Sequence, residues 1–99
     1  MTTHPSELPD ISSYVHLIDR FIGRDISAGD FQKSFLQALK SEHRILGEPV
    51  FPVLQELFED ADAYVDRAEL RTEPEDLDDE QLLACALRAR DALRGLGYD

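Results

Sequence analysis

The stretch from Gln55 to Arg71, QELFEDADAYVDRAELR, holds the chain's densest group of side chains that could do chemistry. Six of its seventeen residues are carboxylates: Glu56, Glu59, Asp60, Asp62, Asp66 and Glu69. Carboxylates at this density can bind a metal ion, carry acid–base catalysis, solvate an exposed helix, or imitate the phosphates of a nucleic acid. The surrounding residues decide between these uses.

A calcium site is the first use to weigh. Asp60, Asp62 and Asp66 stand where the first, third and seventh positions of a calcium-binding loop would fall. However, Val65 replaces the glycine that such a loop needs, and Arg71 replaces its bidentate glutamate. The residues that could bind zinc do not have the spacing of a zinc site; they are His4, His16, His43 and Cys85. We therefore expect no metal and no cofactor.

Catalysis is the second use. The chain contains no GxSxG, P-loop, HExxH or CxxC motif. A pair such as Asp60 and Asp62 could do acid–base work only in a pocket that drives their pKa values apart. An exposed helix face provides no such pocket, so we expect no enzyme. An enzyme that uses this pair remains an alternative, which predicts a deep pocket at both residues. Cys85, among apolar neighbours, is expected to be a small core residue.

The net charge of the 99-residue chain is −11, and it is concentrated in one quarter of the sequence. Residues 56–80 hold twelve acidic residues against two arginines, a local net charge of −10, whereas the rest carries −1. This acidity argues against nucleic acid and anionic lipid as direct partners. A basic protein is the natural partner for such a surface.

The length of the chain fits one domain. Residues 1–9, with two prolines, are expected to form a flexible N-terminal arm, and residues 10–97 the folded domain. A single cysteine cannot close an intrachain disulfide, and there is neither a secretory segment nor an apolar run long enough to cross a membrane. These features predict a cytoplasmic protein.

Four segments have the period of an amphipathic helix, and none alternates like a strand. The first runs from about Asp10 to Ile22. The second begins after a cap at Ser27 and continues to Leu46, with a stop at Gly47. The third runs from about 49 to 68, and the fourth from a cap at Asp78 to about 97. Four such helices with short loops predict an all-α protein, an antiparallel four-helix bundle, with another all-α packing as the alternative.

On the predicted third helix, the apolar residues fall in one arc and the six carboxylates in the opposite arc. Only Arg67 interrupts the acidic arc. Like charges one turn apart cost about 0.2–0.5 kcal/mol per pair in an isolated helix. Because this pattern costs stability, a binding role is favoured over a merely solvated acidic face. Tyr64 is a candidate anchor for a partner, provided that its hydroxyl is exposed.

The run from Tyr14 to Leu93 resembles the colicin D immunity proteins and related immunity proteins of contact-dependent growth inhibition systems. The resemblance depends mainly on two motifs, ISAGDF at residues 26–31 and LFEDADAY at residues 57–64. Arg71 and the DDEQL opening of the fourth helix also match. The two motifs together are moderately specific, whereas either one alone would be weak.

This resemblance implies a helical bundle that binds and blocks a toxin nuclease domain which cuts tRNA in the anticodon region. Acidic side chains would take the place of the tRNA backbone in a basic active site, within a 1:1 complex of monomers. The acids of LFEDADAY carry over directly: Glu59, Asp60 and Asp62. Charge alone extends the predicted toxin-binding set to Glu56, Asp66, Glu69, Glu73, Glu75 and Asp76. The alternative is an acidic interaction module, or a nucleic-acid mimic, that binds another basic regulatory protein.

Overall fold

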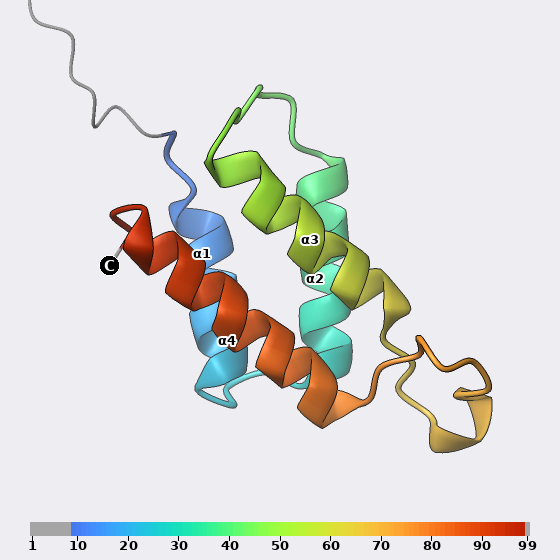
Figure 1. Ribbon diagram of the computed structural model, residues 1–99. Helices are drawn as coiled ribbons and strands as arrows, with labels where there is room; N and C mark the ends of the chain where they lie inside the picture. The colour runs from blue at the N-terminus through green and yellow to red at the C-terminus, as the bar shows by residue number, and fades with distance from the viewer. Residues whose placement is uncertain (1–8, 99) are drawn as a thin grey trace, which may run out of the picture.

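A computed structural model describes residues 9–98 of the chain. Its helices are α1 (Ser12–Ile22), α2 (Ala28–Lys40), α3 (Val50–Ala63) and α4 (Asp79–Gly95), with a short 3-10 turn, η1 (Ala68–Leu70), between the last two (Figure 1). Within the described residues the only β pairing is an isolated parallel bridge between Tyr64 and Leu77. The predicted all-α fold is confirmed. Residues 1–8 of the predicted arm lie outside the described range.

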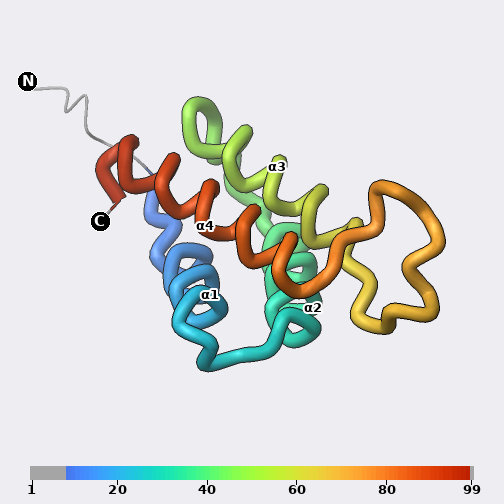
Figure 2. Tube along the Cα trace, turned by 60° about the horizontal axis from the view of Figure 1, so that its bottom comes forward, coloured from blue at the N-terminus to red at the C-terminus, as the bar shows by residue number. Residues whose placement is uncertain are grey.

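The four helices form two antiparallel pairs that cross each other. In both views α1 lies beside α2 and α3 lies beside α4, and the members of each pair run in opposite directions (Figures 1 and 2). Helix α4 packs on α1 and α3 and touches α2 as well. At the far end of α4 the Tyr98 hydroxyl donates to the Pro9 carbonyl, 2.7 Å away, which fastens the two ends of the described chain together.

The core between the pairs is aromatic at its centre. Phe31 and Phe35 of α2 are fully buried, and the Phe31 ring stacks on Phe21 of α1 with centroids 4.7 Å apart. Leu57 of α3 and Leu82 of α4 complete the interior. These residues occupy the apolar arcs of their helices, so the periodicity of the sequence places them correctly.

Both predicted side-chain caps are present. The Ser27 hydroxyl accepts a hydrogen bond from the Asp30 amide at the start of α2, with 3.1 Å between nitrogen and oxygen. At the start of α4, Asp78 and Gln81 form a complete capping box. Each cap satisfies amides that would otherwise lack a partner in the first turn.

Helix α2 is shorter than the sequence predicts. It ends at Lys40 instead of continuing to Leu46, although Leu46 is still buried from the following loop. The Glu42 carboxylate accepts hydrogen bonds from the Tyr14 hydroxyl at 2.8 Å and from the Arg44 amide at 3.0 Å. These contacts compete with continued helix. Gly47 has the predicted positive φ, 70°, but in the loop before α3.

Helix α3 is also shorter, and this difference matters more. It ends at Ala63, not near residue 68 as predicted, because Tyr64 is already extended with ψ of 131°. The Val65 amide then bonds to the Leu77 carbonyl, and the Leu77 amide bonds to the Ala63 carbonyl, each at 3.0 Å. A longer α3 would also have placed further carboxylates against the negative end of its dipole.

Candidate functional site

The nine predicted site residues fall on two neighbouring segments. Glu56, Glu59, Asp60 and Asp62 lie on α3. The other five lie between α3 and α4, in residues 64–78, here called the acidic connection: Asp66, Glu69, Glu73, Glu75 and Asp76. A single helical face carrying six carboxylates is therefore wrong, because α3 ends before Asp66. The acidic connection loops out from the ends of α3 and α4, so both groups of acids belong to this helix pair (Figure 2).

The carboxylates on α3 are left without cations. Glu56, Glu59 and Asp62 are exposed and Asp60 is half-buried. Within residues 9–98 none of the four forms an ion pair, and Glu59 accepts a long side-chain hydrogen bond of 3.3 Å from Gln55. The last turn of α3 contains no basic residue. Since negative charge is unfavourable at a helix C-terminus, this arrangement costs stability and is consistent with a role in binding.

Hydrogen bonds join the beginning and the end of the acidic connection. Besides the backbone pairing of Val65 with Leu77, the Arg71 Nε donates to the Val65 carbonyl at 2.6 Å. The Glu73 amide donates to the Asp76 carboxylate at 3.0 Å. These bonds give the connection a definite shape, and its acids are presented from fixed backbone positions instead of a loose tail.

Two arginines lie inside the acidic connection, and they do different things. Arg67 pairs with Glu69 on the surface, with 3.1 Å between Nε and carboxylate. Arg71 is half-buried, holds the Val65 carbonyl and lies 3.9 Å from the Asp79 carboxylate. Arg71 is therefore a structural cation, whereas the Arg67 pair is exposed and contributes little to stability.

Tyr64 does not serve as an exposed anchor. Its side chain is only 5% exposed, and its hydroxyl donates to the Asp79 carboxylate. Burial, together with that carboxylate, raises the pKa of Tyr64 above its ordinary value. The residue instead joins the end of α3 to the start of α4. Sequence reasoning missed this role because the partners are fifteen positions apart and no local pattern links them.

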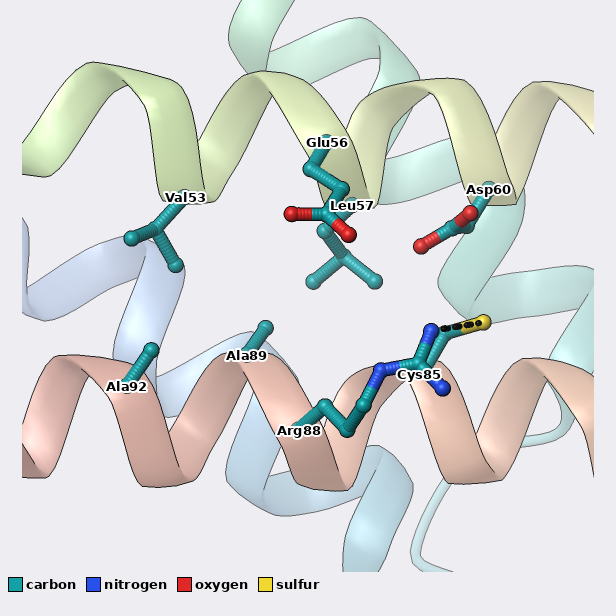
Figure 3. Close-up of a pocket in the computed structure, with 8 residues that line it drawn as sticks. All are labelled: Val53, Glu56, Leu57, Asp60, Cys85, Arg88, Ala89 and Ala92. Carbon is teal, nitrogen blue, oxygen red and sulfur yellow. Dashed lines mark hydrogen bonds between the residues drawn. The ribbon is translucent and has the colours of Figure 1, made fainter.

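A groove of about 240 Å³ runs between α3 and α4 (Figure 3). Glu56 and Asp60 point from α3 toward α4 above it, and Arg88 reaches up from α4. The lining is completed by Val53, Leu57, Cys85, Ala89 and Ala92. The residues on α4 were not predicted as site residues, since their contribution depends on the packing of one helix against another.

Cys85 is buried beside this groove, as expected of a small core residue. The Arg88 Nη2 donates to its sulfur at 3.4 Å. Burial, and then the nearby Asp60 carboxylate, raise the pKa of the Cys85 thiol, while Arg88 acts in the opposite direction. Of Asp60 and Asp62, the pair that the enzyme alternative would use, only Asp60 lines the groove, and Asp62 is exposed outside its lining. The deep pocket that the enzyme alternative requires at both residues is not found there.

Residues 9–98 hold no cluster of potential metal ligands and no helix that could span a membrane. Histidine, cysteine and carboxylate side chains in this range do not gather in threes as a metal ion requires. None of the four helices combines the length and the apolar character needed to cross a membrane.

A family model described as bacterial self-protective colicin-like immunity matches residues 10–96. The matched range contains all four helices and the whole acidic connection. No curated protein and no solved structure matches the chain.

Proposed function

The chain belongs to the family of bacterial self-protective colicin-like immunity proteins, and from this membership we propose that it binds and inhibits a basic toxin nuclease domain through its acidic surface. The acidic surface consists of the exposed carboxylates of α3 and of the acidic connection. In this role the protein is a cytoplasmic inhibitor without catalytic activity, and one copy binds one toxin domain.

The uncompensated charge on α3 supports this proposal most directly. Four carboxylates lie within two turns of one helix, and within the described residues they have no cation of their own. A nuclease has to hold phosphates with basic side chains, so its active site carries the complementary charge. Opposite fields raise the association rate to as much as ~10⁸–10⁹ M⁻¹s⁻¹ at low salt. A fast inhibitor reaches the toxin before the toxin reaches its RNA substrate.

We take the target to be a nuclease domain that cuts tRNA, as the resemblance to colicin D immunity proteins implies. Glu59, Asp60 and Asp62 would occupy positions that tRNA phosphates otherwise take. The acidic connection would extend the same contact along the toxin surface. Its fixed shape supports this proposal, because a preorganised segment loses less conformational entropy on binding than a loose one.

The experiment uses the purified nuclease domain of a colicin-like toxin from the producing strain. Tightness of binding is measured by calorimetry, and inhibition by the protection of tRNA from cleavage. The wild-type protein should block cleavage at one molar equivalent. Glu59→Lys combined with Asp62→Lys should weaken binding about 100-fold or more, since truncating one partner of a charge pair that a complex buries and hydrogen-bonds already costs ~2–5 kcal/mol.

The matched control reverses two other exposed acids, Glu48→Lys with Asp91→Lys, and changes the net charge by the same amount. Its affinity should stay close to wild type. Equal losses in both variants would mean that only the total charge matters and would overturn the assigned surface. If the wild-type protein does not bind this toxin but binds another basic protein, the alternative of a general acidic interaction module replaces the proposal.

A further inference from the structure

We propose that the groove between α3 and α4 receives one arginine side chain of the toxin and so fixes the register of the complex. This inference rests on the proposed function, because it names a partner side chain at the same surface. It adds a defined subsite to an otherwise diffuse electrostatic contact.

The shape of the groove suits a long side chain with an apolar stem. Its floor and walls include four apolar residues, Val53 and Leu57 from α3 and Ala89 and Ala92 from α4. The volume of about 240 Å³ exceeds what one or two waters fill, at roughly 30 Å³ each in the liquid. Arginine buries its methylene stem against apolar surface while its charged head stays near polar groups.

The charge of the groove also selects a cation. Glu56 and Asp60 stand one helical turn apart above it, and both side chains point toward α4 (Figure 3). Arg88, on the opposite side, donates to the sulfur of Cys85. No ion pair is formed between Arg88 and either carboxylate. The groove therefore carries two negative charges and one positive charge, and a second guanidinium makes it neutral.

Arginine is preferred to lysine on geometric grounds. A guanidinium is planar and has five N–H donors, so it can donate to two carboxylates at once, whereas an ammonium is a compact point charge. Charge-assisted hydrogen bonds of this kind are roughly twice as strong as neutral ones. Because the groove is partly enclosed, this contact should act on dissociation, while the exposed acids act on the association rate.

The first test fills the groove without changing any charge. Ala92→Phe places a ring in the groove from an exposed position of α4, and Ala84→Phe is the matched control, an exposed alanine of the same helix that does not line the groove. Binding to the same toxin nuclease domain is followed by stopped flow. Ala92→Phe should raise the dissociation rate about tenfold or more, as expected from losing one buried charged contact. Its association rate should stay within about twofold of wild type, as should both rates of Ala84→Phe.

If Ala92→Phe dissociates as slowly as wild type, the groove is empty in the complex and the inference is overturned, although the proposed function stands. Circular dichroism establishes that the variant is folded. Should it not fold, Glu56→Gln with Asp60→Asn takes its place, since this pair keeps side-chain shape and removes the charge that the guanidinium needs. For this pair the dissociation rate alone decides, because removing two carboxylates of the acidic surface also slows association: faster dissociation supports the inference, and an unchanged dissociation rate overturns it.

The second test needs no toxin. N-acetyl-arginine methylamide is titrated into the protein, and amide chemical shifts are followed by NMR. Shifts should concentrate at Leu57 and Ala89 and should disappear in Ala92→Phe. The neutral citrulline analogue should give none. Equal shifts across the acidic connection would show only diffuse attraction and would overturn the subsite. A toxin that does not bind, together with a groove that does bind the probe, would remove the toxin arginine as its occupant.

Discussion

The side-chain amide of Gln32, on α2, donates a hydrogen bond to the main-chain carbonyl of Tyr64, with 3.0 Å between nitrogen and oxygen. The same nitrogen donates to the carbonyl of Ala61 at 2.9 Å. The last turn of a helix leaves its carbonyls without partners, and these are commonly satisfied by a glycine cap. Here a side chain from another helix supplies that function, and the acidic connection begins at this point.

Replacing Gln32 by alanine should therefore loosen the end of α3. Two hydrogen bonds are lost, each contributing about 0.5–1.5 kcal/mol, so the free energy of unfolding should fall by about 1–3 kcal/mol. Amide hydrogen exchange should accelerate at Val65 and Leu77, whose pairing starts from this end. Gln37→Ala, at an exposed position of the same helix, is the control and should change neither quantity. Unchanged exchange in Gln32→Ala would show that the cap does not hold the connection.

The exposed aspartates Asp62 and Asp30 lie near the C-terminus of one helix and the N-terminus of another. The same substitution should therefore change the stability of the fold in opposite directions. Asp62 lies in the last turn of α3, where the helix dipole disfavours negative charge, so Asp62→Asn should stabilise the fold by about 0.3–1 kcal/mol. Asp30 lies in the first turn of α2, where the dipole favours it, so Asp30→Asn should destabilise the fold by a similar amount. Urea denaturation at low ionic strength measures both. Changes of the same sign would show that the dipole does not govern either position.

The sequence predicts the features that depend on contacts between neighbouring residues, and it fails for those that depend on contacts between distant residues. Ser27 and Asp78 begin their helices through contacts within three residues, and such caps can be read directly from the sequence. The end of α3 is set by Gln32, which is 29 positions away from Ala61, and by the pairing of Val65 with Leu77. The helical periodicity of the sequence continues past Ala63, so it does not reveal the long-range contacts that end the helix.

The candidate site also has one part that the sequence predicts and another that depends on long-range packing. The identity of the acidic residues is a matter of composition and could be predicted, although their toxin contacts stay a prediction. The groove required two helices to pack, which places Asp60 beside Cys85 and Arg88. The amphipathic ring of Tyr64 suits an exposed anchor, but the ring is buried and its hydroxyl donates to Asp79, a contact fifteen positions away that no periodicity predicts.

The three tyrosines should resist ionisation. Burial raises the pKa of Tyr14 to about 12 and raises those of Tyr64 and Tyr98 as well. Absorbance of phenolate near pH 10 should therefore be well below that of three solvated tyrosines, which are half ionised there. Since the folded pKa values lie above the unfolded ones, their contribution to stability is complete below about pH 10. It is lost as pH rises through the folded values. Half-ionisation of all three at pH 10 in the folded protein would contradict this.

The single cysteine reports on the electrostatics of the groove. Because the pKa of Cys85 is raised, alkylation by iodoacetamide at pH 8 should be slow and should accelerate at higher pH. Asp60→Asn removes one cause of the shift and should speed the reaction. Arg88→Gln removes the opposing charge and should slow it. The two variants are controls for each other, because a general loosening of the fold would accelerate both.

The salt dependence of toxin binding tests how the acidic surface works. If its carboxylates stand in for phosphates, the association rate with the nuclease domain should fall steeply between about 50 mM and 500 mM salt, as the Debye length shrinks from ~14 Å to ~4 Å. Dissociation should change much less, because short-range contacts at the centre of the interface hold the formed complex together. Stopped-flow measurements at four salt concentrations give both rates.

Neutral variants decide whether the salt effect belongs to this surface. Glu59→Gln with Asp62→Asn should lower the slope of the association rate against salt, because two carboxylates that steer the encounter are gone. Glu48→Gln with Asp91→Asn removes the same amount of charge from exposed positions outside the acidic surface. This control should leave the slope closer to wild type. A wild-type association rate that stays flat over the whole range would end the phosphate-mimicry mechanism. The membership of the chain in the immunity family would be unaffected, and inhibition would then have to depend on shape and apolar packing instead.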